Sequence, residues 1–166
     1  MVKKLDLIII RGPPGVGKST VSRLLRDRIG KAVLFDVDYI CGMFGEHPKN
    51  KEPRFKAHRI AKLISSKLNN YSVIVERAFG FQEDIDDILK LFGKDKYRVY
   101  VFTLESSLNS LIKKDSGRPS RLRLGEKVIR LLHERFKGSD VKDKGVVIKV
   151  GNKSPKKVVD EIMSFV

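Results

Sequence analysis

Residues 4–20 read KLDLIIIRGPPGVGKST, and this stretch decides the fold. The apolar run within Lys4–Ile10 predicts a strand that is buried on both faces. The next residues, Gly12 to Ser19, satisfy the pattern G-x-x-x-x-G-K-[ST] in full. Apolar residues at helical spacing follow in Ser19–Ile29. A strand, a glycine-rich loop and a helix in this order predict a loop that binds phosphate groups.

The chemistry of this loop follows from its backbone. Glycines allow successive N–H groups to point inward around an anion, and the following helix adds the positive end of its dipole. We expect Lys18 to reach the β- and γ-phosphates of a nucleotide, Ser19 to bind Mg²⁺ through its hydroxyl, and Thr20 to bind the α-phosphate. The expected nucleotide contacts in this segment are Gly12, Pro13, Pro14, Gly15, Val16, Gly17, Lys18, Ser19 and Thr20.

Strand and helix patterns alternate along the rest of the chain. Further strands are predicted at Ala32–Phe35, Tyr71–Val75, Tyr97–Leu104 and Gly145–Val150. Further helices are predicted at Arg54–Leu68, Gln82–Leu91, Ser106–Lys113, Leu124–Phe136 and from Ser154 to Val166, with an irregular stretch at Tyr39–Pro53. This alternation predicts an α/β fold of three layers, a five-stranded parallel sheet with helices on both faces. The length of 166 residues, with no repeat or linker, predicts a single domain over residues 1–166.

Carboxylates follow two of the predicted strands. Asp36 and Asp38 come at the end of the second strand, and Glu76 ends the third. The carboxyl ends of parallel strands share one edge, so we expect all three near the phosphate loop. If the strand stays extended, Asp36 and Asp38 share a face, and one can serve Mg²⁺ while the other takes a proton from an acceptor. The alternatives are a turn at the aspartates and an exposed Glu76 paired with Arg77.

A basic loop, Asp115–Arg123, lies between two predicted helices. Several arginines on one loop suit a lid, placed at about residues 114–124, that closes over the nucleotide. Arg118 and Arg121 are the expected pair. The alternative is a solvated basic connection.

Taken together, the phosphate loop, the Asp36-Val37-Asp38 pair and the arginine loop resemble the small P-loop kinases. These include shikimate and gluconate kinases, chloramphenicol phosphotransferase, zeta-toxin kinases and the kinase domain of polynucleotide kinases. The resemblance implies the P-loop NTPase fold with strand order 2-3-1-4-5, Mg-ATP as phosphate donor and an acceptor hydroxyl. It also implies that Asp38 is the general base, that Lys18 and Arg121 contact the transferring phosphate, and that adenine lies between Arg118 and the loop containing Asn152. Cys41 stands where polynucleotide-kinase-like members often carry an arginine, which leaves the acceptor unassigned.

The charge and composition limit the classes of partner. The net charge of +15 indicates an anionic partner, which includes nucleic acid, a phosphorylated metabolite or nucleotide phosphates, although a lysine-rich surface kept for solubility is the alternative. No apolar run approaches the roughly 18–20 residues that cross a membrane. A single cysteine fits the reducing cytoplasm. His58 and His133 are expected at the surface or at an interface, and a monomer and a dimer both remain open.

Three functions remain open at this point. The first is an ATP-dependent kinase that phosphorylates a hydroxyl of a small molecule, a nucleoside or a polynucleotide end. The second is a nucleoside monophosphate kinase, which would use Arg54, Arg59 and Arg77 to bind the monophosphate. The third is a non-catalytic ATP-binding or nucleic-acid-binding NTPase. For Mg²⁺, the candidate ligands are Ser19, Asp36 and Glu76.

Overall fold

Five parallel strands pair in the order β2-β3-β1-β4-β5, which confirms the predicted sheet. The computed structural model describes residues 4–93 and 95–166, so residues 1–3 and 94 of the expected domain lie outside the described residues. The strands are β1 Leu5–Arg11, β2 Ala32–Asp36, β3 Ser72–Glu76, β4 Tyr97–Glu105 and β5 Val146–Lys149. The helices of the described residues are α1 Lys18–Ile29, α2 Val37–Met43, α3 Lys51–Lys67, α4 Gln82–Phe92, α5 Leu108–Ser116, the 3₁₀ helix η1 Ser120–Leu122, α6 Glu126–Lys137 and α7 Pro155–Met163.

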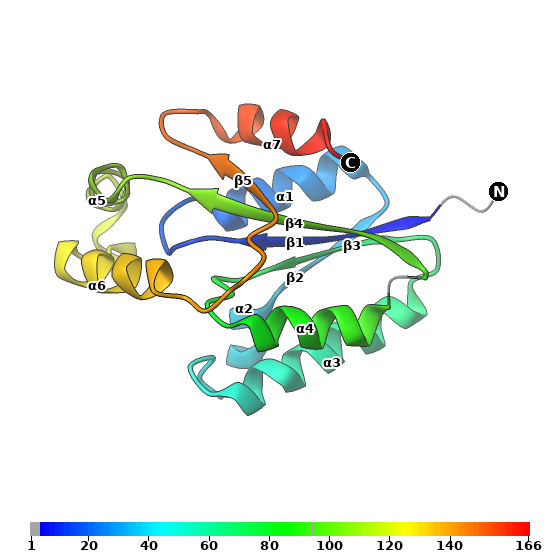
Figure 1. Cartoon of the computed structure of the whole chain (residues 1–166). Coiled ribbons are helices and arrows are strands. Elements are labelled where there is room, and N and C mark those ends of the chain that lie inside the picture. The colour runs from blue at the N-terminus through cyan, green and yellow to red at the C-terminus, as the bar shows by residue number, and fades with distance from the viewer. Residues whose placement is uncertain (1–3, 94) are drawn as a thin grey trace.

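Strand β1 is the centre of the sheet, and helices cover both of its faces. Leu7 and Ile9 pack into the core formed with α2, α3 and α4. Ile8 and Ile10 point to the opposite face and pack into the core formed with α1 and α7. Figure 1 shows these two helix layers above and below the sheet. The continuous apolar run at residues 7–10 of β1 reflects this burial on both sides.

The register of the strands aligns their carboxyl ends. Asp36 at the end of β2 pairs with Glu76 at the end of β3, and Glu76 pairs in turn with Ile10 of β1. Helices α5 and α6 lie beyond this edge of the sheet (Figure 1). The phosphate loop, the strand-end carboxylates and the segment predicted as a lid therefore meet at one edge of the molecule.

Helix α2 extends to Met43 and so overlaps the first part of the stretch Tyr39–Pro53 that the sequence predicts to be irregular; that prediction is wrong there. The carboxylate of Asp36 accepts a hydrogen bond of 3.0 Å from the backbone N–H of Tyr39 and caps the helix. Val37, Ile40 and Cys41 are buried at helical spacing, but the helix is only seven residues long. Such a short periodic segment, with Gly42 inside it and Gly45 just after it, reads as a loop in the sequence.

Both helical histidines are buried, which corrects the expectation of surface positions. His58 on α3 lies near the rings of Phe55 and Phe79, and its Nδ1 is 2.8 Å from a carboxylate oxygen of Asp87. His133 faces inward from α6. The sequence prediction missed these positions because an imidazole ring tolerates burial once it packs against aromatic rings or finds a polar partner.

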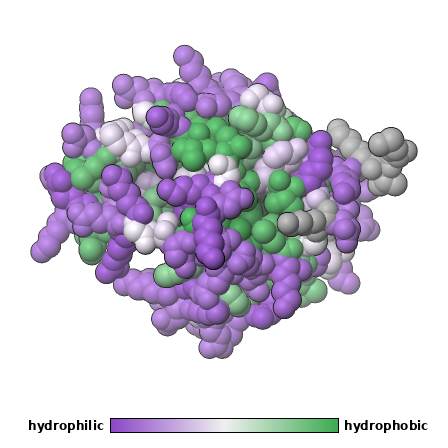
Figure 2. All heavy atoms as spheres, viewed as in Figure 1, coloured by the Kyte–Doolittle hydropathy of each residue, from purple (hydrophilic) through white to green (hydrophobic). Residues whose placement is uncertain are grey.

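The outer surface is mostly polar. Figure 2 shows hydrophilic side chains over most of one face, with apolar side chains visible between them. Among the described residues, no helix is both long and apolar enough to cross a membrane.

Candidate active site

The phosphate loop connects β1 to α1, as predicted, and its glycines are required by its shape. A Cβ atom on Gly12 would lie 2.7 Å from the carbonyl oxygen of Leu104, which is closer than atoms can approach. Gly15 and Gly17 adopt φ angles of 82° and 104°, which favour glycine. Gly17 has no side chain to cap α1, so the first-turn N–H groups remain available to an anion.

Lys18, the first residue of α1, lies folded against the loop. Its Nζ donates hydrogen bonds to the carbonyl oxygens of Gly12 at 3.0 Å and Pro13 at 3.2 Å. Burial lowers the pKa of the Lys18 ammonium group, and the neighbouring carboxylates of Glu76 and Asp38 act in the opposite direction. The ammonium group therefore lies at the entrance to the loop, between the backbone that would hold phosphates and the carboxylate edge.

Glu76 is the most buried of the three predicted carboxylates, with 3% of its surface exposed. Burial raises the pKa of Glu76, while a hydrogen bond with Ser19 and the charge of Lys18 lower it. Asp36 lies beside Glu76 in the sheet, and one of its oxygens is used to cap α2. The structure thus brings Ser19, Asp36 and Glu76 together. Within the described residues, no three His, Cys, Asp or Glu side chains form a metal-binding group on their own.

Asp38 lies in the first turn of α2, so it does not continue the extended strand that would place it on the same face as Asp36. Its carboxylate accepts a hydrogen bond of 2.8 Å from Nε of Arg77. Asp38 is half exposed, whereas Arg77 is nearly buried. The alternative in which Arg77 pairs with Glu76 is not what the structure shows, because Arg77 reaches across to α2.

Arg77 belongs to a buried ion-pair network that the sequence analysis missed. Its Nη1 is 3.1 Å from Asp84, and Nε of Arg54 is 2.8 Å from the other oxygen of the same carboxylate. Asp84 is fully buried on α4. Arg77 also donates a 2.8 Å hydrogen bond to the carbonyl of Pro48, and Arg54 donates one of 2.9 Å to that of Lys49. The network joins the α2–α3 connection, α3 and α4 behind Asp38.

A cavity of about 690 Å³ opens beside this network. Phe81 and Arg77 line it from the segment between β3 and α4, and Leu132 and Arg135 line it from α6. Pro14 of the phosphate loop also lines it, so the cavity borders both the loop and the residue that holds Asp38. Of the aromatic residues in this segment, Phe79 belongs to the core, while Phe81 is about half exposed.

The basic segment between α5 and α6 is organised by Asp115. Its buried carboxylate accepts hydrogen bonds from the backbone N–H groups of Leu124 at 3.1 Å and Gly125 at 2.9 Å. These bonds lower the pKa of Asp115. Arg118, whose Nη1 is 3.6 Å from Asp115, has a guanidinium nitrogen 4.0 Å from the position of a Cβ on Gly15. Arg118 therefore adjoins the phosphate loop.

Three other predicted site residues lie at the surface. Arg121 is exposed within η1, Thr20 is exposed in α1, and Asn152 is exposed in the turn that follows β5. Arg135 and Asp115 are functional candidates that sequence reasoning missed. Arg135 follows no recognisable motif, and the backbone hydrogen bonds of Asp115 depend on how the chain folds between two helices.

Comparisons with known proteins identify a family and a fold. The model of the AAA domain family matches residues 7–138. No curated protein matches the sequence. A gluconokinase from Sinorhizobium meliloti is similar in structure, with a TM-score of 0.71 and 15% identity, over 98% of this chain and 91% of that one. Shikimate kinase from Aquifex aeolicus matches with a TM-score of 0.58 and 20% identity, over 95% and 94% of the two chains.

A chain of the Pnkp1/Rnl/Hen1 RNA repair complex also matches, with a TM-score of 0.66 and 17% identity, over 87% of this chain and 48% of that one. At these identities the likeness shows the fold. The fold is that of the small P-loop kinases, which confirms the resemblance drawn from the sequence.

Proposed function

The chain belongs to the AAA domain family, and we propose that it is an ATP-dependent kinase that transfers the γ-phosphate of Mg-ATP to a hydroxyl group. One observation carries this proposal: the open phosphate loop, the strand-end carboxylates and a cavity of about 690 Å³ adjoin one another at a single edge of the sheet. Phosphoryl transfer needs these three parts, namely a phosphate cradle, groups for Mg²⁺ and a place for the acceptor.

The phosphate side of the site consists of the loop and Lys18. The backbone N–H groups of residues 15–19 hold the phosphates, and Lys18 leaves its carbonyl partners to bind the β- and γ-phosphates. Ser19 and Glu76 fit a hard cation, since both present oxygen atoms and lie near each other. Ser19, Glu76 and the neighbouring Asp36 would hold Mg²⁺ there, and the ion would supply positive charge that offsets the phosphate charge during transfer.

On the acceptor side, Asp38 orients and deprotonates the hydroxyl. The ion pair with Arg77 fixes the direction of its carboxylate, and the half-exposed position leaves an oxygen accessible to an acceptor. The acceptor body lies in the cavity between Phe81 and Leu132. We assign the segment of about residues 114–124 as a lid, in which Arg118 and Arg121 close onto the phosphates and exclude water. Adenine then lies between Arg118 and Asn152.

The acceptor is a small molecule, a nucleoside or a polynucleotide end. The volume of the cavity, about 690 Å³, favours a small molecule, while the net charge of +15 and the likeness to a chain of an RNA repair complex support nucleic acid. We favour a hydroxyl acceptor over a nucleoside monophosphate, because Arg54 and Arg77 already share the buried carboxylate of Asp84, and Arg59 is exposed on α3.

An acceptor screen with radiolabelled ATP tests the proposal, covering nucleosides, oligonucleotides and common metabolites. We expect labelled product with one of these classes. In the variant Asp38→Asn, transfer should fall by about 10²–10⁴-fold, the usual contribution of a general base, with ATP binding retained. Asp160→Asn, an exposed aspartate on α7, is the matched control and should transfer at the wild-type rate. Wild-type transfer by Asp38→Asn would exclude Asp38 as the base, and nucleotide binding without transfer to any acceptor would favour the non-catalytic alternative.

A further inference from the structure

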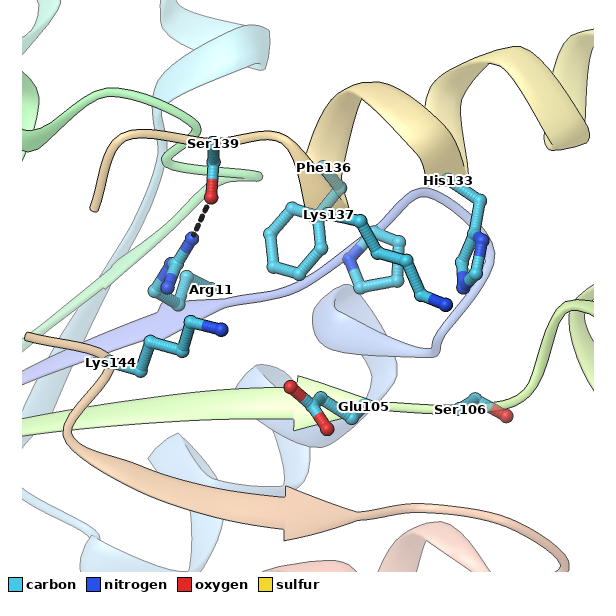
Figure 3. Close-up of a pocket in the computed structure, with 9 residues that line it drawn as sticks. Arg11, Glu105, Ser106, His133, Phe136, Lys137, Ser139 and Lys144 are labelled. Atoms are coloured by element: carbon cyan, nitrogen blue, oxygen red, sulfur yellow. Dashed lines mark hydrogen bonds between the residues drawn. The ribbon is translucent and has the colours of Figure 1, made fainter. Parts of the chain in front are cut away.

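A second cavity, of about 190 Å³, lies between the phosphate loop, the end of β4 and the last turn of α6. Phe136 and Ser139 line both this cavity and the larger acceptor cavity, so the two adjoin. Figure 3 shows the ammonium groups of Lys137 and Lys144 directed into the space between α6 and β4. The charged residues that line the smaller cavity are three basic side chains and one carboxylate, namely Arg11, Lys137, Lys144 and Glu105. The proposed transfer reaction assigns no role to any of the four.

Arg11, the last residue of β1, is a fully buried cation. It donates hydrogen bonds to neutral acceptors only: the carbonyl of Phe79 at 3.2 Å, the hydroxyl of Thr103 at 3.4 Å and the hydroxyl of Ser139 at 3.2 Å. Its guanidinium carbon lies 4.8 Å from the centre of the Phe136 ring. No carboxylate of residues 4–93 or 95–166 forms an ion pair with it, in contrast to the other buried arginine, Arg54.

A buried charge that forms no ion pair is costly. Burial lowers the pKa of the Arg11 guanidinium group, and the charge of Glu105, on the wall of the same cavity, offsets this only in part. Three hydrogen bonds also leave two of the five N–H donors of the arginine without an acceptor. An anion in the adjoining cavity would supply the missing negative charge.

Ser106 gives a second and independent indication of a missing ligand. Its hydroxyl is buried on the wall of the same cavity and has no hydrogen-bond partner among the described residues. Buried polar groups are normally paired, and an orphan hydroxyl at a cavity wall indicates a partner that arrives from outside the chain. Two ammonium groups, a guanidinium group and a hydroxyl approach this space from different elements, an arrangement that suits a ligand with several acceptor oxygens.

We propose that this cavity binds a phosphate group, held by Lys137, Lys144 and Ser106 above the buried charge of Arg11. The phosphate is either inorganic or carried by the acceptor. In the second case the inference deepens the proposed function, because the substrate would be an alcohol that already bears a phosphate, with its body in the larger cavity. Binding of phosphate in this cavity requires only Lys137, Lys144, Ser106 and Arg11, and does not require the kinase reaction.

Calorimetric titration with inorganic phosphate tests the site, after the phosphate loop has been filled with Mg²⁺ and a non-hydrolysable ATP analogue. Lys144→Met should weaken phosphate binding by about tenfold, the effect of losing a charge-assisted hydrogen bond. Lys142→Met is the matched control, because it removes an exposed lysine from the same loop and should leave the affinity unchanged. Ser106→Ala should also weaken binding, and Glu105→Gln should strengthen it because it removes the opposing charge.

Strengthening by Glu105→Gln is a result that a purely structural role for these residues would not produce. The site is disproved if the wild-type protein binds no phosphate under these conditions, or if Lys142→Met and Lys144→Met lose affinity equally. The variants at Glu105, Lys142 and Lys144 alter partly or fully exposed side chains, so the test does not depend on whether a change at Arg11 still folds.

Two further titrations identify the source of the phosphate and separate this site from the kinase reaction. Ribose 5-phosphate and ribose serve as probes: a carried phosphate predicts that ribose 5-phosphate binds more tightly than ribose and inorganic phosphate, in a manner that depends on Lys144. Equal or tighter binding of inorganic phosphate indicates the free anion. In Lys18→Met, which disables the phosphate loop, phosphate binding that still depends on Lys144 upholds the cavity site even if the kinase proposal fails.

Discussion

Replacement of Asp84 by asparagine tests the network that positions the proposed base. Asp84 is fully buried, and its two oxygens accept from Arg54 at 2.8 Å and Arg77 at 3.1 Å. Asp84→Asn preserves the size of the side chain but removes the only negative charge that both arginines share. Removing one partner from a buried ion pair typically costs about 3–5 kcal/mol, and the remaining amide oxygen places this change near the lower end.

A loss of about 3 kcal/mol corresponds to a fall of about 6–12 °C in the melting temperature of a chain of this size. Thermal melting and urea unfolding, with both variants at the same pH, provide the measurement. Asp86→Asn is the control on the same helix, since Asp86 is exposed and bonds only to Gln82, and it should change the unfolding free energy by less than about 0.5 kcal/mol. Phosphate transfer should also fall in Asp84→Asn, because Arg77 no longer holds Asp38 in one direction. If Asp84→Asn destabilises the protein no more than Asp86→Asn does, the account of the network is refuted.

Three further predictions follow from single contacts. In Gly12→Ala, the new Cβ would meet the carbonyl of Leu104 at 2.7 Å, so nucleotide binding measured by calorimetry should be lost. The control Gly42→Ala, where nothing lies within 4 Å of the new Cβ, should bind nucleotide normally. Normal binding by Gly12→Ala would contradict the loop geometry. Burial lowers the pKa of His58 below its ordinary value, so the folded state resists protonation and stability should fall as the pH drops below about 6.5, the ordinary histidine pKa. The dependence of the urea midpoint on pH between 7.5 and 5.5 should be weaker in His58→Gln, and an unchanged dependence would exclude His58 as its source. Asp115→Asn should raise the KM for ATP at a temperature at which the variant is still folded, because the carboxylate fixes the segment that carries Arg118. An unchanged KM in steady-state kinetics would show that this reasoning is wrong.

Much of the fold and the phosphate side of the site is encoded locally, which is why the sequence predicts them. The apolar run of β1 and the loop after it depend only on residues close in the sequence. The meeting of Asp36 and Glu76 could also be predicted, because parallel strands align their carboxyl ends whatever the intervening segments do. Helix α2 escaped prediction because its seven residues carry one buried stripe that is too short to show a period.

The acceptor side depends on contacts between residues far apart in the chain, and these leave no pattern in the sequence. Arg77 reads as the natural partner of its neighbour Glu76, yet it pairs with Asp38, which lies 39 positions away. Arg77 pairs with Asp38 and not with Glu76 because the two neighbours face different sides of the strand end. Glu76 turns toward Ser19 and Lys18, whereas Arg77 faces the side of Asp84.

The buried arginines also differ in their charged partners. Arg54 and Arg77 lie beside a buried carboxylate, so their charges are balanced within the chain, and their effect is to hold Asp38 and the walls of the acceptor cavity. Arg11 is equally buried, but the described residues give it only neutral acceptors. The cavity beside it carries one carboxylate, Glu105 of β4, against the ammonium groups of Lys137 and Lys144, so positive charge is in excess there. Excess positive charge at a cavity that adjoins the acceptor side is the property expected of a binding site, whereas a structural arginine is normally neutralised by its surroundings.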